Sequence, residues 1–235
     1  MKHLKKSSLL FLLVCCMAIR TKAQVGYDYA QYDIGFGIGM NTAYGDAETT
    51  TSTKSYHFNF TYNYSPFINY IIEAQFGQLK GGDSLTTYSG RQFNNNFSAV
   101  MFKVQVQAGE IMDYSQSNMS NFFKNVYIST GVGFVVNHIT DISRYSTLIP
   151  GYYTPGLNNS NEILIPAKIG YEIKFFNRFE QPSIKLDLGY QYNFVLGDEL
   201  DGFQVGTKRD AYSQIVVGLK FAIGGITSYR KQITY

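Results

Sequence analysis

The chain has 235 residues, enough for one domain with a sizeable core. Both cysteines lie in the first 23 residues, so the rest of the chain has no disulfide or thiol chemistry. Beyond that segment no apolar run reaches the length of a membrane-spanning helix, which excludes a helical membrane protein. Five of the 20 Lys and Arg residues also lie in residues 1–23. The remaining 15 stand against 17 Asp and Glu, a net charge of −2, which offers no basic surface for nucleic acid.

Residues 1–23 predict a signal peptide. Three lysines precede the apolar run 9–19, and the small residues that a signal peptidase needs follow at Thr21 and Ala23. We place cleavage between Ala23 and Gln24. A lipoprotein signal at Cys15 or Cys16 is the alternative, which the residues before them disfavour. The sequence therefore predicts a signal peptide at 1–23.

Alternation of apolar and polar residues with a period of two recurs along the remaining chain. With 20 Tyr, 18 Phe, 22 Gly and only 5 Pro, the composition also favours antiparallel strands. In segment 183–196, one face carries only aliphatic and aromatic residues, and a strand sorts residues this way but a helix does not. The pattern predicts eight strands: 32–41, 55–64, 70–77, 100–107, 126–137, 162–175, 183–196 and 214–223. Pro166 lacks an N–H for the ladder, and we expect a bulge there.

These strands predict an all-β fold, an eight-stranded antiparallel up-and-down transmembrane β-barrel at 24–224, followed by a periplasmic tail at 225–235. The apolar face is too pure on all eight strands for a soluble lipocalin-type barrel or a sandwich, the two alternatives with the same alternation. If the chain starts in the periplasm, the long polar loops face outside the cell: 45–54, 79–96, 140–161 and 197–210. The short turns 65–67 and 177–182 then face the periplasm, with the longer turn 109–124.

The polar face of the strands carries charges that should meet in the lumen. The predicted lumen charge network comprises Asp33, Glu73, Lys103, Lys168, Glu172, Lys174, Lys185, Asp187 and Lys220. Side chains just fill the interior of an eight-stranded barrel, and buried charges must pair. The sequence therefore predicts a plug of salt bridges, with a narrow ion path as the alternative.

Catalytic and metal-binding patterns are weak. Ser55 and His57 share a strand face, but at about 7 Å apart we expect no direct hydrogen bond between them and no enzyme activity. Two distant histidines, His57 and His138, predict no metal site and nothing predicts a cofactor. Four acidic residues crowd the last outer loop, where we expect a solvated acidic loop rather than a calcium site: Asp198, Glu199, Asp201 and Asp210.

The long turn 109–124 holds more apolar residues than a solvated loop needs. They either fold against the barrel rim or form a docking patch for a periplasmic or membrane partner. The candidate docking residues are Met112, Tyr114, Phe122 and Phe123.

The last strand resembles the recognition signal that the barrel-assembly machinery reads on outer-membrane barrels. The pattern consists of Gln214, Val216, Gly218, Phe221 and Ile223. The whole mature chain, with its Ala–Gln cleavage site, resembles the small porin-like outer-membrane β-barrel proteins of Bacteroidetes. Its strand–turn–strand segment at 105–133 resembles the accessory barrels of type IX secretion. The resemblance implies contact with outer-membrane lipid, transient binding to the assembly machinery, and no catalytic residues.

The sequence thus predicts a non-enzymatic outer-membrane barrel with a plugged lumen. Its expected role is structural or interactive, for example as an accessory subunit of an envelope or secretion complex. One alternative is a narrow channel for small solutes or apolar ligands. The other is a surface adhesin that acts through the loop at 140–161, where Tyr152 and Tyr153 could anchor a ligand.

Overall fold

The structure is a computed structural model that describes residues 25–115, 117–205 and 209–231. Strands make up most of it: β1 (Val25–Tyr44), β2 (Thr50–Thr51), β3 (Thr53–Asn63), β4 (Ile68–Gly82), β5 (Gln92–Gln107), β6 (Val126–Ser143), β7 (Asn159–Phe176), β8 (Pro182–Val195) and β9 (Ala211–Lys231). A 3₁₀ turn, η1 (Ala108–Glu110), and a short helix, α2 (Asn118–Phe123), join β5 to β6. No helix in the described ranges is long and apolar enough to cross a membrane.

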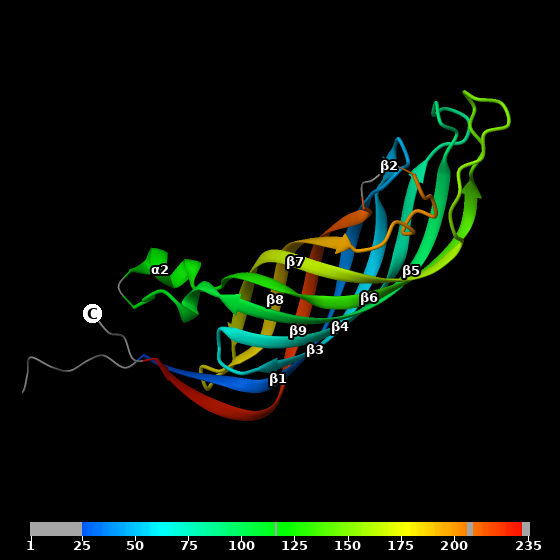
Figure 1. The fold of residues 1–235 in the computed structure, drawn as a ribbon. Coiled ribbons are helices and arrows are strands. Elements are labelled where there is room, and N and C mark those ends of the chain that lie inside the picture. The colour runs from blue at the N-terminus through cyan, green and yellow to red at the C-terminus, as the bar shows by residue number, and fades with distance from the viewer. Residues whose placement is uncertain (1–24, 116, 206–208, 232–235) are drawn as a thin grey trace, which may run out of the picture.

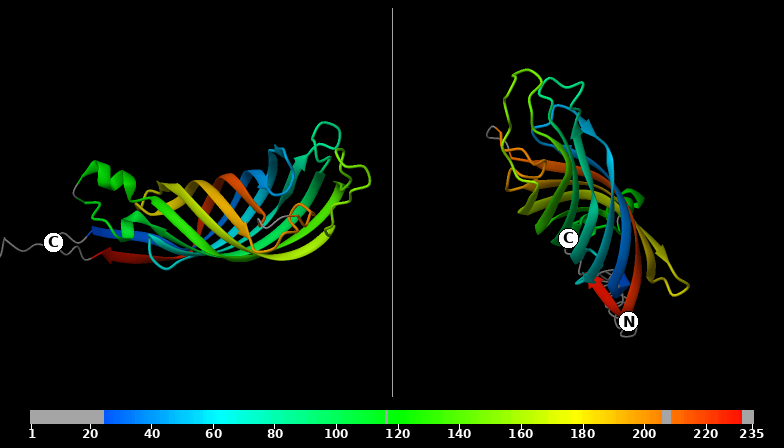
Figure 2. Two further views of the ribbon diagram at one scale, coloured as in Figure 1. Left: turned by 45° about the horizontal axis from the view of Figure 1, so that its top comes forward. Right: turned by 90° about the vertical axis from the view of Figure 1, so that its right-hand side faces the viewer.

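The eight long strands close into a ring. Each pairs antiparallel with the next along the chain, and β1 pairs with β9 to complete the circle. The two-residue strand β2 adds only to the end of β4. The eight-stranded antiparallel barrel predicted from the sequence is confirmed. Figures 1 and 2 show a tilted tube that carries α2 and the outer ends of β1 and β9 at one end, the terminal end, and the longest loops at the other, the loop end.

Several strands are longer than the alternation predicted. At the loop end, β4 ends at Gly82, β5 begins at Gln92 and β6 ends at Ser143. The predicted loop 79–96 is therefore reduced to residues 83–91. At the terminal end, residues 226–231 of β9 pair with residues 25–30 of β1. The expected tail from residue 225 therefore begins as a two-stranded ribbon that projects beyond the barrel (Figure 1).

The ribbon bends away from the barrel at a bulge. The register between β1 and β9 shifts between Ala30 and Tyr32, opposite Gly224, whose φ is +84°. A glycine in this left-handed conformation is what such a bulge needs, because a side chain would strain it.

Pro166 does not form the predicted bulge. The β6–β7 register is the same on both sides of it, but the pairing is interrupted between Thr130–Ala167 and Gly133–Leu164. Pro166 has no N–H to donate, and the Thr130 hydroxyl donates to its carbonyl oxygen at 3.0 Å. The seam between β6 and β7 is therefore the interrupted part of the barrel wall.

The two faces of the wall differ as predicted. Outward residues are large and apolar on every long strand, including Ile34, Phe58, Ile72, Phe102, Phe134, Ile169, Leu188 and Ile215. Inward residues in the middle of the barrel are polar and buried. Toward the loop end the lumen instead holds an apolar cluster that the alternation did not predict.

Candidate functional site

The lumen charge network lies inside the barrel, and each of its nine residues is at most 9% exposed. Four lysines each contact one carboxylate closely: Lys103–Glu73 at 2.8 Å, Lys168–Asp187 at 2.7 Å, Lys185–Asp33 at 2.6 Å and Lys220–Glu172 at 2.9 Å. The fifth, Lys174, lies 3.9 Å from Glu172 and donates to two neutral oxygens at 2.8 Å. The network thus joins charges from β1, β4, β5, β7, β8 and β9.

The strand register explains which charges meet. Glu172 lies opposite Asp187, and Lys185 lies opposite Lys220, so direct neighbours in the ladder carry like charges. Like charges in such positions repel, and each is instead neutralised by a partner offset along the lumen or across it. Glu172, for example, binds Lys220 and accepts a hydrogen bond from Gln107 at 3.1 Å. Sequence alternation predicted the members of the network but not these pairs.

Polar residues that the sequence analysis did not single out complete the lumen. The Tyr127 hydroxyl donates to Asp187, and its ring lies 5.5 Å from the Lys168 ammonium. Lys103 donates to Gln191 at 3.1 Å. The sequence did contain a signal for Tyr127. It lies between the outward residues Val126 and Ile128 of β6, so alternation turns it inward.

Ser55 and His57 do form the direct contact that the sequence analysis excluded. The Ser55 Oγ lies 3.0 Å from His57 Nε2, and His57 Nδ1 lies 3.3 Å from Glu73 Oε1. The prediction failed because it used backbone spacing, whereas side chains on one face of a twisted strand can lean together. The order of groups is that of a serine–histidine–carboxylate triad.

Other side chains enclose the Ser55 hydroxyl. Ser55 is fully buried, and its hydroxyl donates to Asn41 Oδ1 at 2.7 Å rather than to the histidine. It also accepts from Gln214 at 3.2 Å. A nucleophile needs a free approach for the substrate, whereas every direction around this hydroxyl is taken by side chains. We interpret the contact as part of the lumen packing.

An apolar plug seals the lumen near the loop end. Its largest side chains are Phe93, Phe97, Met101, Leu164, Leu200, Phe203 and Tyr212. Leu200 and Phe203 come from the loop between β8 and β9, which folds into the barrel mouth and leaves both side chains at most 1% exposed. We call residues 198–205 the lid. The apolar residues at inward positions 97, 99 and 101 of β5 signalled an apolar stretch of the lumen, but the inward course of the lid has no local sequence signal.

Hydrogen bonds fix the lid to the rim. The Asp46 N–H donates to Asp201 Oδ2 at 2.6 Å, and the Val205 N–H donates to Asp46 Oδ2 at 3.1 Å. Asp210 Oδ2 accepts from the Leu200 N–H at 2.9 Å. From the neighbouring loop, Arg144 donates to the Gly202 carbonyl at 3.0 Å.

The expectation of a solvated acidic loop is wrong for three of its four carboxylates. Asp201 and Asp210 are 1% and 2% exposed, and Glu199 is also buried. Burial, together with repulsion from Asp201, raises the pKa of Asp210 to about 9. Burial likewise raises the pKa of Asp201 to about 7. Protonation of Asp210 thus removes its repulsion from Asp201 and stabilises the lid in this position. Among the described residues, no three His, Asp or Glu side chains are arranged to hold a metal ion.

The predicted docking residues separate at the terminal end. Phe122 and Phe123 of α2 are 57% and 45% exposed, and Phe122 stacks on Tyr171 with ring centroids 5.0 Å apart. Met112 is half-buried, and Tyr114 is buried against Phe67. Tyr114 thus packs against the rim, which is one of the two alternatives from the sequence. The other, a docking patch, stays a prediction for the partly exposed Phe122 and Phe123.

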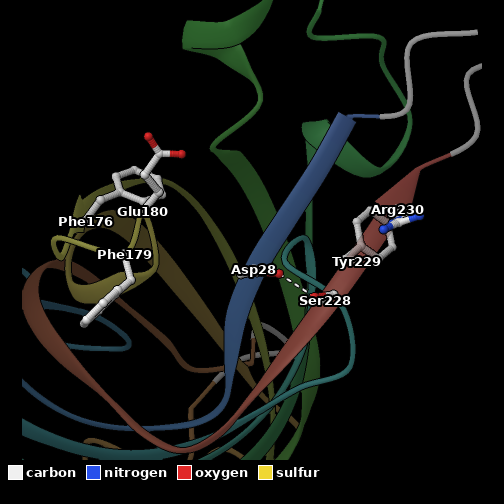
Figure 3. A pocket seen from close by; sticks show the side chains of 7 residues that line it. All are labelled: Asp28, Phe176, Phe179, Glu180, Ser228, Tyr229 and Arg230. Carbon is white, nitrogen blue, oxygen red and sulfur yellow. Dashed lines mark hydrogen bonds between the residues drawn. The ribbon is translucent and has the colours of Figure 1, made fainter.

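A cleft of 710 Å³ lies beside the ribbon at the same end. Figure 3 shows Phe176, Phe179 and Glu180, at the end of β7 and in the turn that follows, and Asp28 with Ser228, Tyr229 and Arg230 on the ribbon. The Ser228 hydroxyl donates to Asp28 at 2.5 Å and fixes the two strands to each other. The cleft combines exposed rings with charges of both signs.

The residues of the predicted assembly signal all lie on β9. Gln214 and Val216 are buried on the lumen side with Gly218, whereas Phe221 and Ile223 face outward. The strand continues past this pattern to Lys231.

Comparisons with known proteins give no family. No protein-family model and no curated protein matches the chain. Among solved structures, neisserial surface protein A is 13% identical, with 83% of this chain and 98% of that chain covered and a TM-score of 0.44. Ail, the attachment invasion locus protein of Yersinia pestis, is 11% identical (86% and 99% covered, TM-score 0.42). The outer membrane protein OprG from Pseudomonas aeruginosa is 11% identical (88% and 99% covered, TM-score 0.36). These values are too low to carry any property of those proteins over to this chain.

Proposed function

We propose that the chain is a non-enzymatic, integral outer-membrane β-barrel with a sealed lumen, which acts through its surfaces and not by conduction or catalysis. The observation that carries this proposal is the apolar belt on the outside of the ring. Side chains such as Ile38, Phe58 and Phe134 are about half exposed or more, a state that water disfavours and lipid satisfies.

The height of the belt fits a membrane. On β8 the outward apolar residues run from Ile184 to just past the strand end at Leu196, about 40 Å along a strand at ~3.3 Å per residue. A strand tilted by about 45° then spans about 28 Å, close to the hydrocarbon thickness of a bilayer.

The sealed lumen supports an interaction role over the channel alternative. Fully buried polar residues such as Gln191, Asn193 and Glu172 leave no space for a water molecule beside them. The apolar plug and the lid close the barrel above that layer. An ion would have to break buried salt bridges in order to pass.

The terminal end supplies the surface for a periplasmic or membrane partner. Solvent-exposed phenylalanines are costly unless something covers them, and aromatic side chains often dominate binding energy at interfaces. We infer that Phe122 and Phe123 bind a subunit of an envelope complex, and a role beside type IX secretion is one form of this proposal.

Affinity purification from native membranes in mild detergent tests the docking proposal. The unaltered chain should recover a stoichiometric partner, and F122A/F123A should lose it at least tenfold while the barrel stays folded. Leu85, 91% exposed at the opposite end, gives the control L85A, which should keep the partner. Equal recovery with F122A/F123A and L85A would contradict the proposed docking surface.

The loop-end tip supports a second candidate function, that of an adhesin. Residues in the segment 145–157 expose an apolar surface to the cell exterior: Tyr145, Leu148, Ile149, Tyr152, Tyr153 and Leu157. Tyr145 and Tyr153 pair across the tip with ring centroids 5.5 Å apart. Cells that display Y152A/Y153A chains should adhere less than cells with the unaltered chain. Equal adhesion would exclude this function.

A further inference from the structure

Lys54 and Lys80 lie on the outer wall, where strands otherwise present apolar residues. Their strand neighbours Ser55 and Leu79 are fully buried inside the barrel, so alternation turns both lysines outward. Lys54 pairs in the ladder with Met40 of β1, which is also outward and exposed.

The two lysines line one groove of 530 Å³ at the edge of the apolar belt. Tyr56 and Phe76 form its side toward the belt and are 55% and 48% exposed. Hydroxyl residues of the segment 51–53 form its side toward the loop end. The groove thus changes from apolar to cationic toward the loop end, as a lipid changes from acyl chain to headgroup.

The charge of the groove is uncompensated. No Asp or Glu is among the residues that line it, and neither ammonium forms an ion pair with any residue in the described ranges. The nearest carboxylates along the chain accept hydrogen bonds elsewhere: Glu48 from the Tyr88 and Ser89 N–H groups, and Asp83 from the Leu85 N–H. Two adjacent cations without an anion form a site for an anionic group of more than one charge.

We propose that this groove binds the phosphorylated headgroup of an outer-leaflet lipid, with Lys54 and Lys80 on the phosphate and the acyl chains against Tyr56 and Phe76. The proposal rests on the proposed membrane-spanning function, which places the loop end at the outer surface. Lysines at this level can extend to the headgroup region while their methylene stems cover apolar surface.

The experiment uses the mature chain in detergent micelles and measures bound lipid by native mass spectrometry. The probes are a bisphosphorylated lipid A, the same lipid without phosphates, and inorganic phosphate alone. K54Q/K80Q removes both charges with little change in length. Loss of two surface cations should weaken binding of the phosphorylated lipid about 30-fold.

The matched control is R178Q/R230Q, which removes two exposed cations from the terminal end. It should bind the phosphorylated lipid as the unaltered chain does. Three results would each overturn the proposal: unchanged binding by K54Q/K80Q, equal binding of the lipid without phosphates, or saturation by inorganic phosphate at the concentrations that suffice for the lipid. An equal loss in the control would overturn it too, because binding would then follow total charge.

Insertion of every variant into vesicles is measured separately by protease protection. A failure of the unaltered chain to insert would contradict the membrane-spanning function. Insertion of all variants with equal lipid binding would contradict the groove alone.

Discussion

Removal of one carboxylate from the lumen should destabilise the whole barrel. Glu172 is fully buried, binds Lys220 at 2.9 Å, lies 3.9 Å from Lys174 and accepts from Gln107. E172Q keeps the shape of the side chain but removes the carboxylate closest to Lys220, whose next carboxylate, that of Asp187, lies 3.9 Å away. Breaking one partner out of a buried ion pair typically costs about 3–5 kcal/mol, a large fraction of the total stability of about 5–15 kcal/mol.

The assay is denaturant unfolding in lipid vesicles. Because the chain contains no tryptophan, far-UV circular dichroism and the gel mobility of folded and unfolded barrels report the transition. The control is E180Q, an exposed glutamate in the β7–β8 turn, which should change stability by less than about 0.5 kcal/mol. The double variant E172Q/K220M should regain part of the loss, because it removes both charges of the closest pair. The reasoning is refuted if E172Q is no less stable than E180Q.

Three further predictions follow from the lid, the wall and the buried serine. The raised pKa of Asp210 makes the closed lid most stable where the carboxyl is protonated, and this stability declines as pH rises from about 4 toward 9. D210N should therefore match the unaltered chain in thermal stability at pH 4 and exceed it at pH 9, and no gain at pH 9 would contradict the raised pKa of Asp210. P166V should raise the unfolding midpoint, since an N–H at this position lets β6 and β7 pair without interruption in a wall surrounded by lipid, and a lower midpoint would show that the interruption stabilises the barrel. Purified chain should hydrolyse no phospholipid or ester, and S55A should behave identically; an activity that disappears in S55A would mean that the Ser55–His57–Glu73 contact is catalytic.

The barrel itself could be predicted because its signal is local. Alternation within single strands, such as 183–196, sorts residues to two faces without any knowledge of their partners. The members of the lumen charge network follow from the same alternation of inward and outward positions. Which lysine meets which carboxylate depends instead on strand stagger and on contacts across the lumen, as in Lys185–Asp33 between β8 and β1. Those depend on the whole closed ring.

The loop end could not be predicted for a related reason. Asp201 and Asp210 resemble solvated loop residues in the sequence, but backbone N–H groups from the lid and from Asp46 surround them. Leu200 and Phe203 are two apolar residues in a polar loop, and only the mouth of the finished barrel gives them a place to pack. Ser55 and His57 show the limit of an argument from backbone spacing. Their backbones are about 7 Å apart along the strand, but the side chains turn toward each other and bring Oγ and Nε2 to 3.0 Å.

The central claim is that the chain spans the membrane as a sealed barrel, and planar-bilayer recording tests it most directly. The mature chain, with insertion verified by protease protection in the same lipid, should give no discrete conductance steps in concentrated KCl. Regular steps of uniform size from the unaltered chain would contradict the sealed lumen and favour the channel.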